Sequence, residues 1–545
     1  MTTATQEVDP AAEIREPITA HAPWRDNAVV AAEVSALRDQ YSDAHLDLAE
    51  ALCDRHPQDA TAFIGVDRAL QVTSMTYGQL ADRSRRLASV LGAKGVRRGS
   101  RVGVLMGKTL QLPIVLLAIW RLGAVHVPLF TAFAGPAIAT RVNGARAALI
   151  VVDPDQADKL DGIEIPALHS GATLDEQIDG ADPIAQREAV GSDGVFVQLY
   201  TSGTTGVPKG VAVPVFAIAA FTAYMRYGLD VRDDDILWNV ADPGWAYGLY
   251  YGIIGPLAIG RPNILLEGGF SAEAMGRVVE NVGVTNLAAS PTVYRALKAQ
   301  GIVFGGGGLR VASSAGEPLT PDVTAWAPGA LGAEVFDHWG QTEQGMGIVN
   351  ACDPRVRRDV KPGSMGPAMP GFVAGTRGEQ IVLSVHESPL MWFTGYVGAP
   401  TQTAERFTDD GSWYLTGDVG HHDGTDFFFA SRDDDVILAA GYRIGPNDIE
   451  SIIATDPAVA EVAVVGRPDE IRGEVVEAFV VLTPHATAEG LTERLQSAVR
   501  SRYGAHAYPR RVHVIGALPK TPSGKIQRFI LRKLNDDELE EIVLQ

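Results

Sequence analysis

Length, composition and charge exclude several classes of protein. The chain has 545 residues, of which 46% are hydrophobic and 21% charged, as is ordinary for a soluble globular protein. Its formal net charge of −20 argues against binding to nucleic acid or to an anionic membrane surface, since both require clustered Lys and Arg.

Further features of the sequence indicate the compartment. Cys53 and Cys352 are the two cysteines, and they show neither a disulfide pattern nor metal-ligand spacing, which predicts reduced thiols. The acidic N-terminal region does not resemble a secretion signal, and the apolar stretches at 112–129 and 250–266 are each interrupted by Arg. We therefore predict a cytoplasmic protein without a membrane span.

Apolar, strand-like runs alternate with amphipathic stretches between about residues 76 and 319. The strand candidates are 101–106, 147–152, 195–200, 263–266 and 284–288, and the clearest helical stretches are 77–91 and 272–281. Such alternation is typical of largely parallel sheets covered by helices. We predict an α/β fold whose large N-terminal domain, residues 1–433, contains these sheets. Residues 1–40 are expected to form an extended N-terminal segment.

A loop rich in Gly, Ser and Thr follows the strand candidate at 195–200. Residues 200–210 read Tyr-Thr-Ser-Gly-Thr-Thr-Gly-Val-Pro-Lys-Gly. Glycines let backbone N–H groups curve around an anion, while hydroxyl groups and a lysine supply donors to phosphate oxygens. The Gly-Lys-Ser/Thr ending of a Walker A loop is absent, and a surface linker is the alternative. The predicted polyphosphate ligands are Thr201, Ser202, Gly203, Thr204, Thr205 and Lys209.

The stretch 337–343, Asp-His-Trp-Gly-Gln-Thr-Glu, is the second informative motif. A carboxylate close to a polyphosphate is repulsive unless a cation lies between them, so Glu343 is a candidate Mg²⁺ ligand. Thr342 could donate to a phosphate, and Asp337 could accept from an adenine amino group. Taken alone, this heptad is weak evidence.

Two turns complete a candidate nucleotide site. The small-residue turn 314–318 could lie flat against a purine, although an ordinary helix-entry turn explains it equally well. Asp418 follows a tight glycine and could accept both hydroxyls of a ribose, whereas the plain alternative is a Gly-Asp turn.

The C-terminal part of the chain has its own apolar pattern. A composition change near 409–411 and an aromatic strand at 427–429 precede an acidic run at 431–435. Strand candidates at 461–465 and 475–482 and a helix at 491–503 then predict a smaller, mobile α+β C-terminal domain, residues 434–545. Within it, Lys525 follows Ser-Gly in a proline-containing loop, which is typical of a positioned cation or of a basic exposed loop.

The order and spacing of these motifs resemble the acyl-adenylate-forming superfamily of acyl-CoA synthetases, peptide-synthetase adenylation domains and luciferases. The resemblance extends over residues 76–533, and the stretches 128–130 and 241–245 are most similar to acetyl- and medium-chain acyl-CoA synthetases. It implies a small-molecule carboxylate, ATP, Mg²⁺ and coenzyme A as reactants and cofactor. It also implies a hinge at Asp434 and a catalytic role for Lys525, Thr342 and Glu343.

The resemblance carries over further residue roles. Nucleotide contacts are implied for Gly316, Glu317, Pro318, Asp337, His338, Trp339, Gly340, Gln341, Thr342, Asp418 and Arg432. An acyl pocket is implied for Trp245, Ala246, Tyr247, Ala315 and Gly340. Coenzyme A contacts are implied for Ala440, Gly441, Tyr442 and Arg443. Ser431, Leu438 and Ala440 depart from residues that are frequent in the superfamily, and the last two lie on the surface expected to meet coenzyme A.

These roles predict an AMP-forming carboxylate–CoA ligase. Attack of a carboxylate on the α-phosphorus of ATP requires two anions to approach, and Lys525 would bridge them. The alternatives are a stand-alone enzyme that loads a carrier-protein phosphopantetheine thiol and a nucleotide-binding protein without catalysis. The position of Gly340 holds a tryptophan in similar enzymes that use acetate, so we predict short- to medium-chain acids and expect Gly340→Trp to restore acetate preference. The resemblance also makes Lys525 a candidate target of a regulatory protein acetyltransferase.

Overall fold

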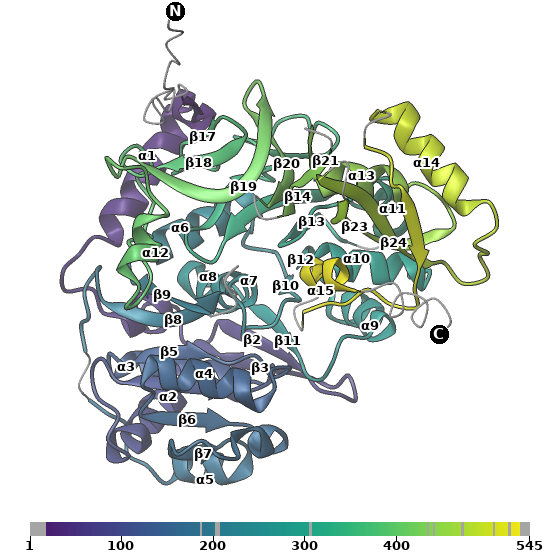
Figure 1. Ribbon diagram of the computed structural model, residues 1–545. Helices are drawn as coiled ribbons and strands as arrows, with labels where there is room; N and C mark the ends of the chain where they lie inside the picture. The colour runs from purple at the N-terminus through teal and green to yellow at the C-terminus, as the bar shows by residue number, and fades with distance from the viewer. Residues whose placement is uncertain are drawn as a thin grey trace, which may run out of the picture.

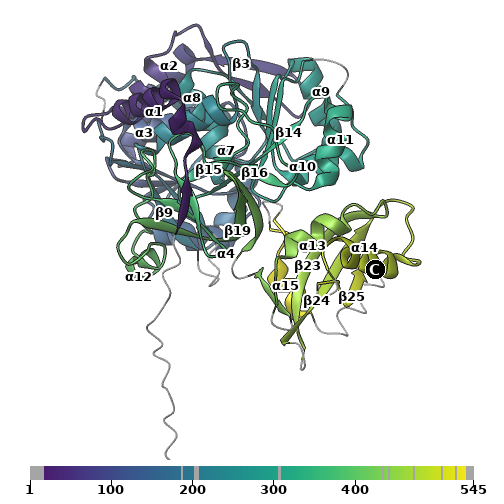
Figure 2. The same cartoon turned by 90° about the horizontal axis from the view of Figure 1, so that it is seen from above.

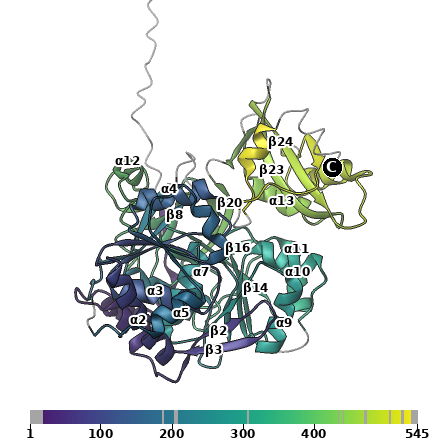
Figure 3. The ribbon, with the colours of Figure 1, turned by 90° about the horizontal axis from the view of Figure 1, so that it is seen from below.

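A computed structural model describes residues 18–185, 188–201, 208–304, 308–432, 435–439, 442–469, 473–504, 507–521 and 525–534. The chain forms a large N-terminal domain and a smaller C-terminal domain that lies to one side of it (Figure 1, Figure 2). Figure 3 shows the same arrangement from below. The predicted α/β fold class, with a large domain of sheets and helices and a small C-terminal domain, is confirmed.

The first sheet of the large domain is parallel apart from an antiparallel strand at one edge. Its order is β7 (Ala167–His169), β6 (Leu149–Val152), β4 (Arg101–Leu105), β5 (Val125–Pro128), β8 (Val195–Thr201) and β9 (Lys209–Pro214). Helices cover both faces, because alternate residues of these buried strands point to opposite sides. Val104 belongs to the core that contains α2 (Tyr77–Ala93) and α3 (Gln111–Arg121), whereas Leu105 packs with α4 (Gly135–Ala145).

The second sheet has eight strands, more than any other described sheet, and its inner strands are parallel. Its order is β15 (Gly345–Val349), β14 (Val335–Gln341), β13 (Val311–Ala315), β12 (Asn286–Ala289), β10 (Leu237–Asn239), β11 (Asn263–Leu266), β2 (Thr61–Val66) and β3 (Val72–Thr76). One face packs against α9 (Ala272–Val282), α10 (Pro291–Ala299) and α11 (Pro321–Leu331). Residues 337–341 of the motif 337–343 belong to β14. The rest of the motif lies in the turn to the antiparallel strand β15, at the end of the sheet.

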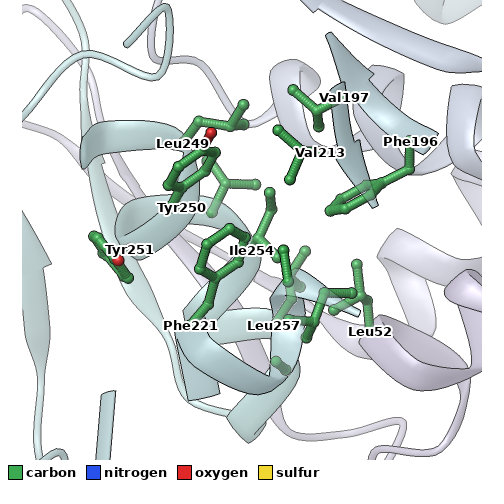
Figure 4. Packing of buried hydrophobic residues seen from close by; sticks show 14 of the residues in the cluster. Leu52, Phe196, Val197, Val213, Phe221, Leu249, Tyr250, Tyr251, Ile254 and Leu257 are labelled. Atoms are coloured by element: carbon green, nitrogen blue, oxygen red, sulfur yellow. The ribbon is translucent and has the colours of Figure 1, made fainter. Parts of the chain in front are cut away.

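Buried aromatic and aliphatic side chains join the two sheets. Helices α6 (Ala217–Ala223), α7 (Ala246–Leu249) and α8 (Gly255–Ile259), with the π-helical turn Tyr250–Ile254, lie between them. Figure 4 shows Phe221, Tyr250 and Leu257 from these helices in one apolar cluster with Val197 and Val213 of the first sheet. The rings of Phe221 and Tyr250 stack with centroids 4.4 Å apart.

A third, antiparallel sheet closes the large domain and leads to the small one. Its order is β1 (Thr19–His21), β17 (Ala374–Arg377), β18 (Gln380–Ser384), β19 (Trp413–Asp423), β20 (Asp426–Arg432) and β16 (Ser364–Gly366). Residues 18–40 are therefore part of the domain rather than an appendage. β1 pairs with β17, and α1 (Ala28–Gln40) buries Val30, Val34 and Leu37.

The C-terminal domain contains a mixed sheet with two helices packed on it. Its strands are β22 (Tyr442–Ile444), β21 (Ile437–Ala439), β24 (Gly473–Leu482), β23 (Val459–Asp469) and β25 (Arg511–Val514). Helices α13 (Pro446–Ile453) and α14 (Leu491–Arg502) bury Ile449 and Leu495 against this sheet, and α15 (Arg528–Lys533) follows the loop that carries Lys525. The predicted domain boundary at 433/434 lies outside the described residues and stays a prediction.

The remaining helices are short or peripheral: Pro23–Asp26, Glu50–Asp54, Pro154–Leu160, α5 (Ala172–Asp179), Tyr224–Gly228 and α12 (Pro400–Ala404). None of the helices in the described ranges combines the length and apolar character that a bilayer crossing requires.

A buried ion pair in the large domain gives a test of its stability. Asp54 and Arg121 have side chains that are each 3% exposed, and Arg121 donates to both carboxylate oxygens at 2.9 and 2.6 Å. We expect Asp54→Ala to lower the free energy of unfolding by about 3–5 kcal/mol, because it leaves a buried guanidinium without its counter-ion. Denaturant unfolding measures this loss. Asp82→Ala is the control, since the Asp82 side chain is 54% exposed in its pair with Arg86 and should cost at most about 1 kcal/mol. Equal losses in the two variants would contradict the expectation.

Candidate active site

The site is built on the ends of β13 and β14, where alternation along β14 separates two sets of side chains. Residues 336, 338 and 340 share one face, and 337, 339 and 341 share the other. Ala315 lies opposite His338 in the parallel pairing, so the face that carries His338 also carries Ala315 and Ser313. The predicted nucleotide and acyl residues therefore divide between opposite faces of the same strands.

Asp418 is the best-positioned carboxylate of the predicted nucleotide site. It is 3% exposed, and its Oδ2 accepts hydrogen bonds from Trp339 Nε1 at 2.9 Å and Gln341 Nε2 at 2.8 Å. Arg432, directly opposite on β20, lies 2.9 Å from Oδ1. The carboxylate is thus oriented by three side chains, Trp339, Gln341 and Arg432. A carboxylate held in this way can accept a hydrogen bond from a ribose hydroxyl.

Trp339 and Gln341 act on Asp418 through these side-chain hydrogen bonds. Gln341 also accepts from Tyr414 Oη at 2.8 Å and donates to the Thr416 carbonyl at 2.9 Å, so its amide is held at both ends. Their polar groups orient the carboxylate that faces the predicted ribose position. The predicted contact of both residues with the nucleotide stays a prediction.

Glu343 takes part in a buried network that the sequence did not predict. The Tyr396 hydroxyl donates to Glu343 Oε1 at 2.8 Å and accepts from Arg406 Nε at 3.2 Å. The Lys209 ammonium lies 5.1 Å from the centre of the Tyr396 ring. Tyr396 thus connects the end of the predicted phosphate loop to the predicted Mg²⁺ ligand. Its only sequence signal, a tyrosine after Thr-Gly, is too common to predict a site.

The donor set near Glu343 fits a magnesium ion that is bound mainly by a nucleotide. Glu343 is 7% exposed and keeps one carboxylate oxygen outside its hydrogen bond with Tyr396. Among the described residues, no cluster of three or more His, Cys, Asp or Glu side chains could hold a metal. Mg²⁺ is commonly bound by one or two carboxylates together with substrate phosphates, so a single glutamate is sufficient here.

Lys525 lies within this group of charges, although it belongs to the C-terminal domain. Burial among protein atoms lowers the pKa of Lys525, and the nearby Arg432 guanidinium lowers it further, while Glu317, Asp418 and Glu343 raise it. Its backbone N–H donates to Thr521 Oγ1 at 3.0 Å, and its carbonyl accepts from the Thr521 N–H at 2.7 Å, which closes the loop. Although protein atoms of both domains crowd the side chain, part of its surface is exposed to solvent. A ligand bound among these charges could therefore contact this cation.

An ion pair stabilises the turn 314–318, which is predicted to contact the purine. Glu317 accepts from Arg295 at 2.6 Å and from Thr292 Oγ1, and Gly316 adopts a φ of 98° that favours glycine. The side chain of Glu317 is thus engaged in positioning the turn, and the backbone of 316–318 remains as the predicted contact surface.

Asp337 lies beside this turn on the outer face of β14. Burial raises the pKa of Asp337 to about 8, although backbone N–H groups of Leu319 and His338 partly stabilise its charged form. At neutral pH the carboxyl is therefore mostly protonated. A protonated carboxyl is a poorer acceptor than a carboxylate for the adenine amino group that Asp337 is predicted to bind.

The structure does not support a nucleotide contact by the His338 side chain. Its Nε2 lies 3.0 Å from the Asn350 carbonyl and its Nδ1 lies 2.7 Å from the Tyr224 hydroxyl, both in buried surroundings. A carbonyl only accepts, so Nε2 carries the hydrogen and Nδ1 accepts from Tyr224. The ring is turned to the inner face, toward the predicted acyl pocket.

Gly340 does not open a tunnel, and the expectation for Gly340→Trp is wrong in this backbone. A Cβ atom at Gly340 would lie 2.2 Å from the Gly345 carbonyl oxygen and 2.7 Å from Met346 Cα. These are backbone atoms of β15, at a register shift in the β14–β15 pair. Glycine is required by the close approach of two strands, so the space that a tryptophan would occupy is filled by the main chain.

The other predicted acyl-pocket residues come from two elements. Trp245, Ala246 and Tyr247 begin α7 and remain partly exposed, whereas Ala315 on β13 is buried. The Trp245 ring packs 5.4 Å from Phe130 and 5.3 Å from Phe133, centroid to centroid.

The predicted phosphate-loop and coenzyme A residues lie partly outside the described ranges. Thr201 ends β8 and Lys209 begins β9, so the predicted phosphate loop connects these two antiparallel strands. Tyr442 and Arg443 belong to β22. The residues outside the described ranges are Ser202, Gly203, Thr204, Thr205, Asp434, Ala440 and Gly441.

The chain folds into a large and a small α/β domain, and comparisons with known proteins identify its family. The chain matches the AMP-binding enzyme family over residues 49–375 and its C-terminal domain family over residues 448–525. It is 32% identical to the acetyl-coenzyme A synthetase of Bacillus subtilis (strain 168), with 84% of each chain covered. The human mitochondrial acyl-coenzyme A synthetase ACSM3 is also 32% identical, with 87% of this chain and 85% of the relative covered.

A solved structure supports the same assignment. The acyl-CoA synthetase of Brucella canis is 38% identical and superposes with a TM-score of 0.72, covering 94% of this chain and 99% of that one. The chain belongs to the AMP-binding enzyme family and, within it, to the AMP-forming acyl-CoA synthetases. It is an ATP-dependent ligase that joins a carboxylic acid to coenzyme A through an acyl-adenylate.

The protonation of Asp337 predicts a pH dependence of ATP use. An ionised carboxylate is the better acceptor for an adenine amino group, and with a pKa of about 8 its ionised fraction rises between pH 7 and pH 9. We expect the KM for ATP to fall about tenfold over that range, since only the competent fraction binds. Asp337→Asn should have a higher KM without this slope. Steady-state kinetics with saturating acid provide the measurement. The same slope in the Asn variant would assign the effect to another group.

Proposed function

We propose that this acyl-CoA synthetase activates a short-chain acid and uses Lys525 as the cation of the first half-reaction. The observation that carries the proposal is the position of Lys525 within electrostatic reach of Arg432, Asp418 and Glu343. A cation there would be close to both a nucleotide anchored at Asp418 and an acid near Ala246 and Ala315. The proposed short chain length is supported by the β15 main chain beside Gly340.

The first step requires that two anions approach each other. Lys525 would reduce the repulsion between the acid carboxylate and the α-phosphate, so the carboxylate oxygen attacks phosphorus and pyrophosphate leaves. Lys209 and Thr342 would hold the β- and γ-phosphates, and Asp418 would hold the ribose. A magnesium ion at Glu343 would neutralise phosphate charge.

The second step has different requirements, because pyrophosphate has left and the attacking group is a thiol. Lys525 then has no further role, and the small domain is free to turn about Asp434 and bring 440–443 to the coenzyme A path. Acetylation of Lys525 by a regulatory acetyltransferase would remove its charge and block only the first step. A cytoplasmic location completes the proposal and is supported by the acidic composition.

Lys525→Ala tests the proposed division of labour. We expect a loss of adenylate formation of about 10²–10³-fold, the usual effect of removing one group that stabilises transition-state charge. Thioester formation from synthetic acyl-adenylate and coenzyme A should stay within about threefold of wild type. Pyrophosphate exchange and thioester release measure the two steps. Lys520→Ala is the matched control, because that neighbouring lysine pairs with Glu461 at 2.5 Å. Normal adenylation with a failed thioester step would refute the assignment.

Asp434→Pro tests the hinge. Proline fixes φ, so the variant should hold one domain arrangement and affect the two half-reactions by clearly different factors. Asp434→Ala, which leaves φ free, should change both only slightly. Loss of both steps to the same extent in the proline variant, with an unchanged melting temperature, would count against rotation at this residue.

A further inference from the structure

An ion-pair cluster in the C-terminal domain holds the helix that follows Lys525. Arg528, the first residue of α15, donates from Nη2 to both carboxylate oxygens of Glu450 at 2.8 Å each, and its Nη1 lies 3.5 Å from Asp435 Oδ2. Arg532, one turn later, donates to Asp435 Oδ1 at 2.5 Å. The four side chains are between 8% and 27% exposed. We call these four residues the arginine clamp, in which two carboxylates balance two guanidinium groups.

The clamp joins three parts of the C-terminal domain. Glu450 lies on α13, and its Oε1 also accepts from the Val464 N–H of β23 at 2.7 Å. Asp435 directly follows Asp434, the predicted hinge residue. The arginines belong to α15. The central sheet, the segment after the predicted hinge and α15 are therefore connected through charged hydrogen bonds, which are stronger than neutral ones.

The loop of Lys525 is attached to the clamp by a short, closed stretch of chain. The Gln527 N–H donates to the Pro519 carbonyl at 2.9 Å, and Lys520 and Ile526 form an antiparallel bridge. Arg528 follows at once. Helix α15 has six residues, of which Leu531 is buried, so apolar packing fixes its direction weakly. The rigid fork of an arginine that contacts two carboxylates fixes it better.

The clamp lies on the side of the C-terminal domain that faces the predicted nucleotide site. Burial lowers the pKa of Arg528, but the carboxylates of Glu450 and Asp435 raise the pKa more, so the net shift is upward. Glu317 of the large domain raises it as well. The same glutamate raises the pKa of Lys525. Arg528 and Lys525 are thus both within electrostatic reach of the turn that is predicted to contact the purine.

We propose that Arg528, Glu450 and Asp435 are positioning residues that direct Lys525 toward the reacting anions during adenylate formation. Groups that act on charge in a transition state must be held in place by supporting hydrogen bonds, and the clamp supplies them. Because Asp435 is part of the clamp, rotation at residue 434 carries α15 and the lysine with it. The inference rests on the proposed function, since the clamp acts through Lys525.

Arg528→Gln tests the proposal. We expect kcat of adenylate formation to fall about 10²-fold, the scale of loss that misplacement of a reacting group by about 1 Å produces. The KM for ATP should stay within about threefold, because most predicted nucleotide contacts lie in the large domain. Thioester formation from synthetic acyl-adenylate and coenzyme A should also stay within about threefold. ATP–pyrophosphate exchange and thioester release measure the two steps, and melting temperatures report folding.

Further variants separate positioning from folding. Arg528→Lys keeps the charge but reaches one carboxylate at a time, so its adenylation rate should lie between those of wild type and Arg528→Gln. Asp435→Asn, a neutral isostere, should also slow adenylation selectively, and it replaces Arg528→Gln if that variant does not fold. Arg494→Gln is the matched control, because Arg494 on α14 pairs with Asp456 at 3.2 Å elsewhere in the same domain. Both steps should be unchanged in the control.

A double variant shows whether the clamp acts through the lysine. If it does, Lys525→Ala combined with Arg528→Gln should adenylate no more slowly than Lys525→Ala alone, within about threefold. Losses that multiply would overturn the inference. Equal loss in both half-reactions, or normal adenylation in Arg528→Gln and Asp435→Asn, would also overturn it. In each of these cases a slow Lys525→Ala variant would still support the proposed function. Normal adenylation by Lys525→Ala would refute the proposed role of the lysine and the inference with it.

Discussion

The pairing of Asp418 with Arg432 links the nucleotide site to the connection between the domains. The two residues face each other across β19 and β20, and Arg432 is the last residue of β20. Trp339 and Gln341 reach the same carboxylate from β14, so sheets two and three meet at Asp418. A change in this carboxylate would therefore disturb both the predicted ribose contact and the point from which the small domain departs. The position of Lys525 near Asp418 depends on the same junction.

Much of the fold was predictable because its signals are local. Buried parallel strands such as Asn263–Leu266 are short apolar runs that can be recognised in the sequence. Helix α2 begins at a capping box formed by Thr76 and Gln79, so its start can also be recognised without knowledge of the tertiary structure. Motif order was equally informative about the enzyme class. The N-terminal segment was harder to interpret, since β1 is three residues long and pairs with β17, more than 350 residues later in the sequence.

The details of the site depended on strand faces and on backbone approach, which a linear motif does not encode. Trp339 and His338 are neighbours in sequence, yet alternation sends one to Asp418 and the other to Tyr224. Gly340 was interpreted as missing bulk, whereas the register shift in β14–β15 places main-chain atoms where its side chain would be. Tyr396 was missed because its contact with Glu343 joins residues 53 positions apart.

The charge distribution is consistent with the role proposed for Lys525. The chain carries 66 acidic and 46 basic residues, so a permanent cluster of cations is not provided by the surface as a whole. Within the site, Lys209, Arg406 and Arg432 are each already in contact with an aromatic ring, a hydroxyl or a carboxylate of the large domain. These cations can remain in place through both steps. Lys525 differs because the C-terminal domain carries it. Under the proposed function, the positive charge needed while two anions meet would then be withdrawn once pyrophosphate has left.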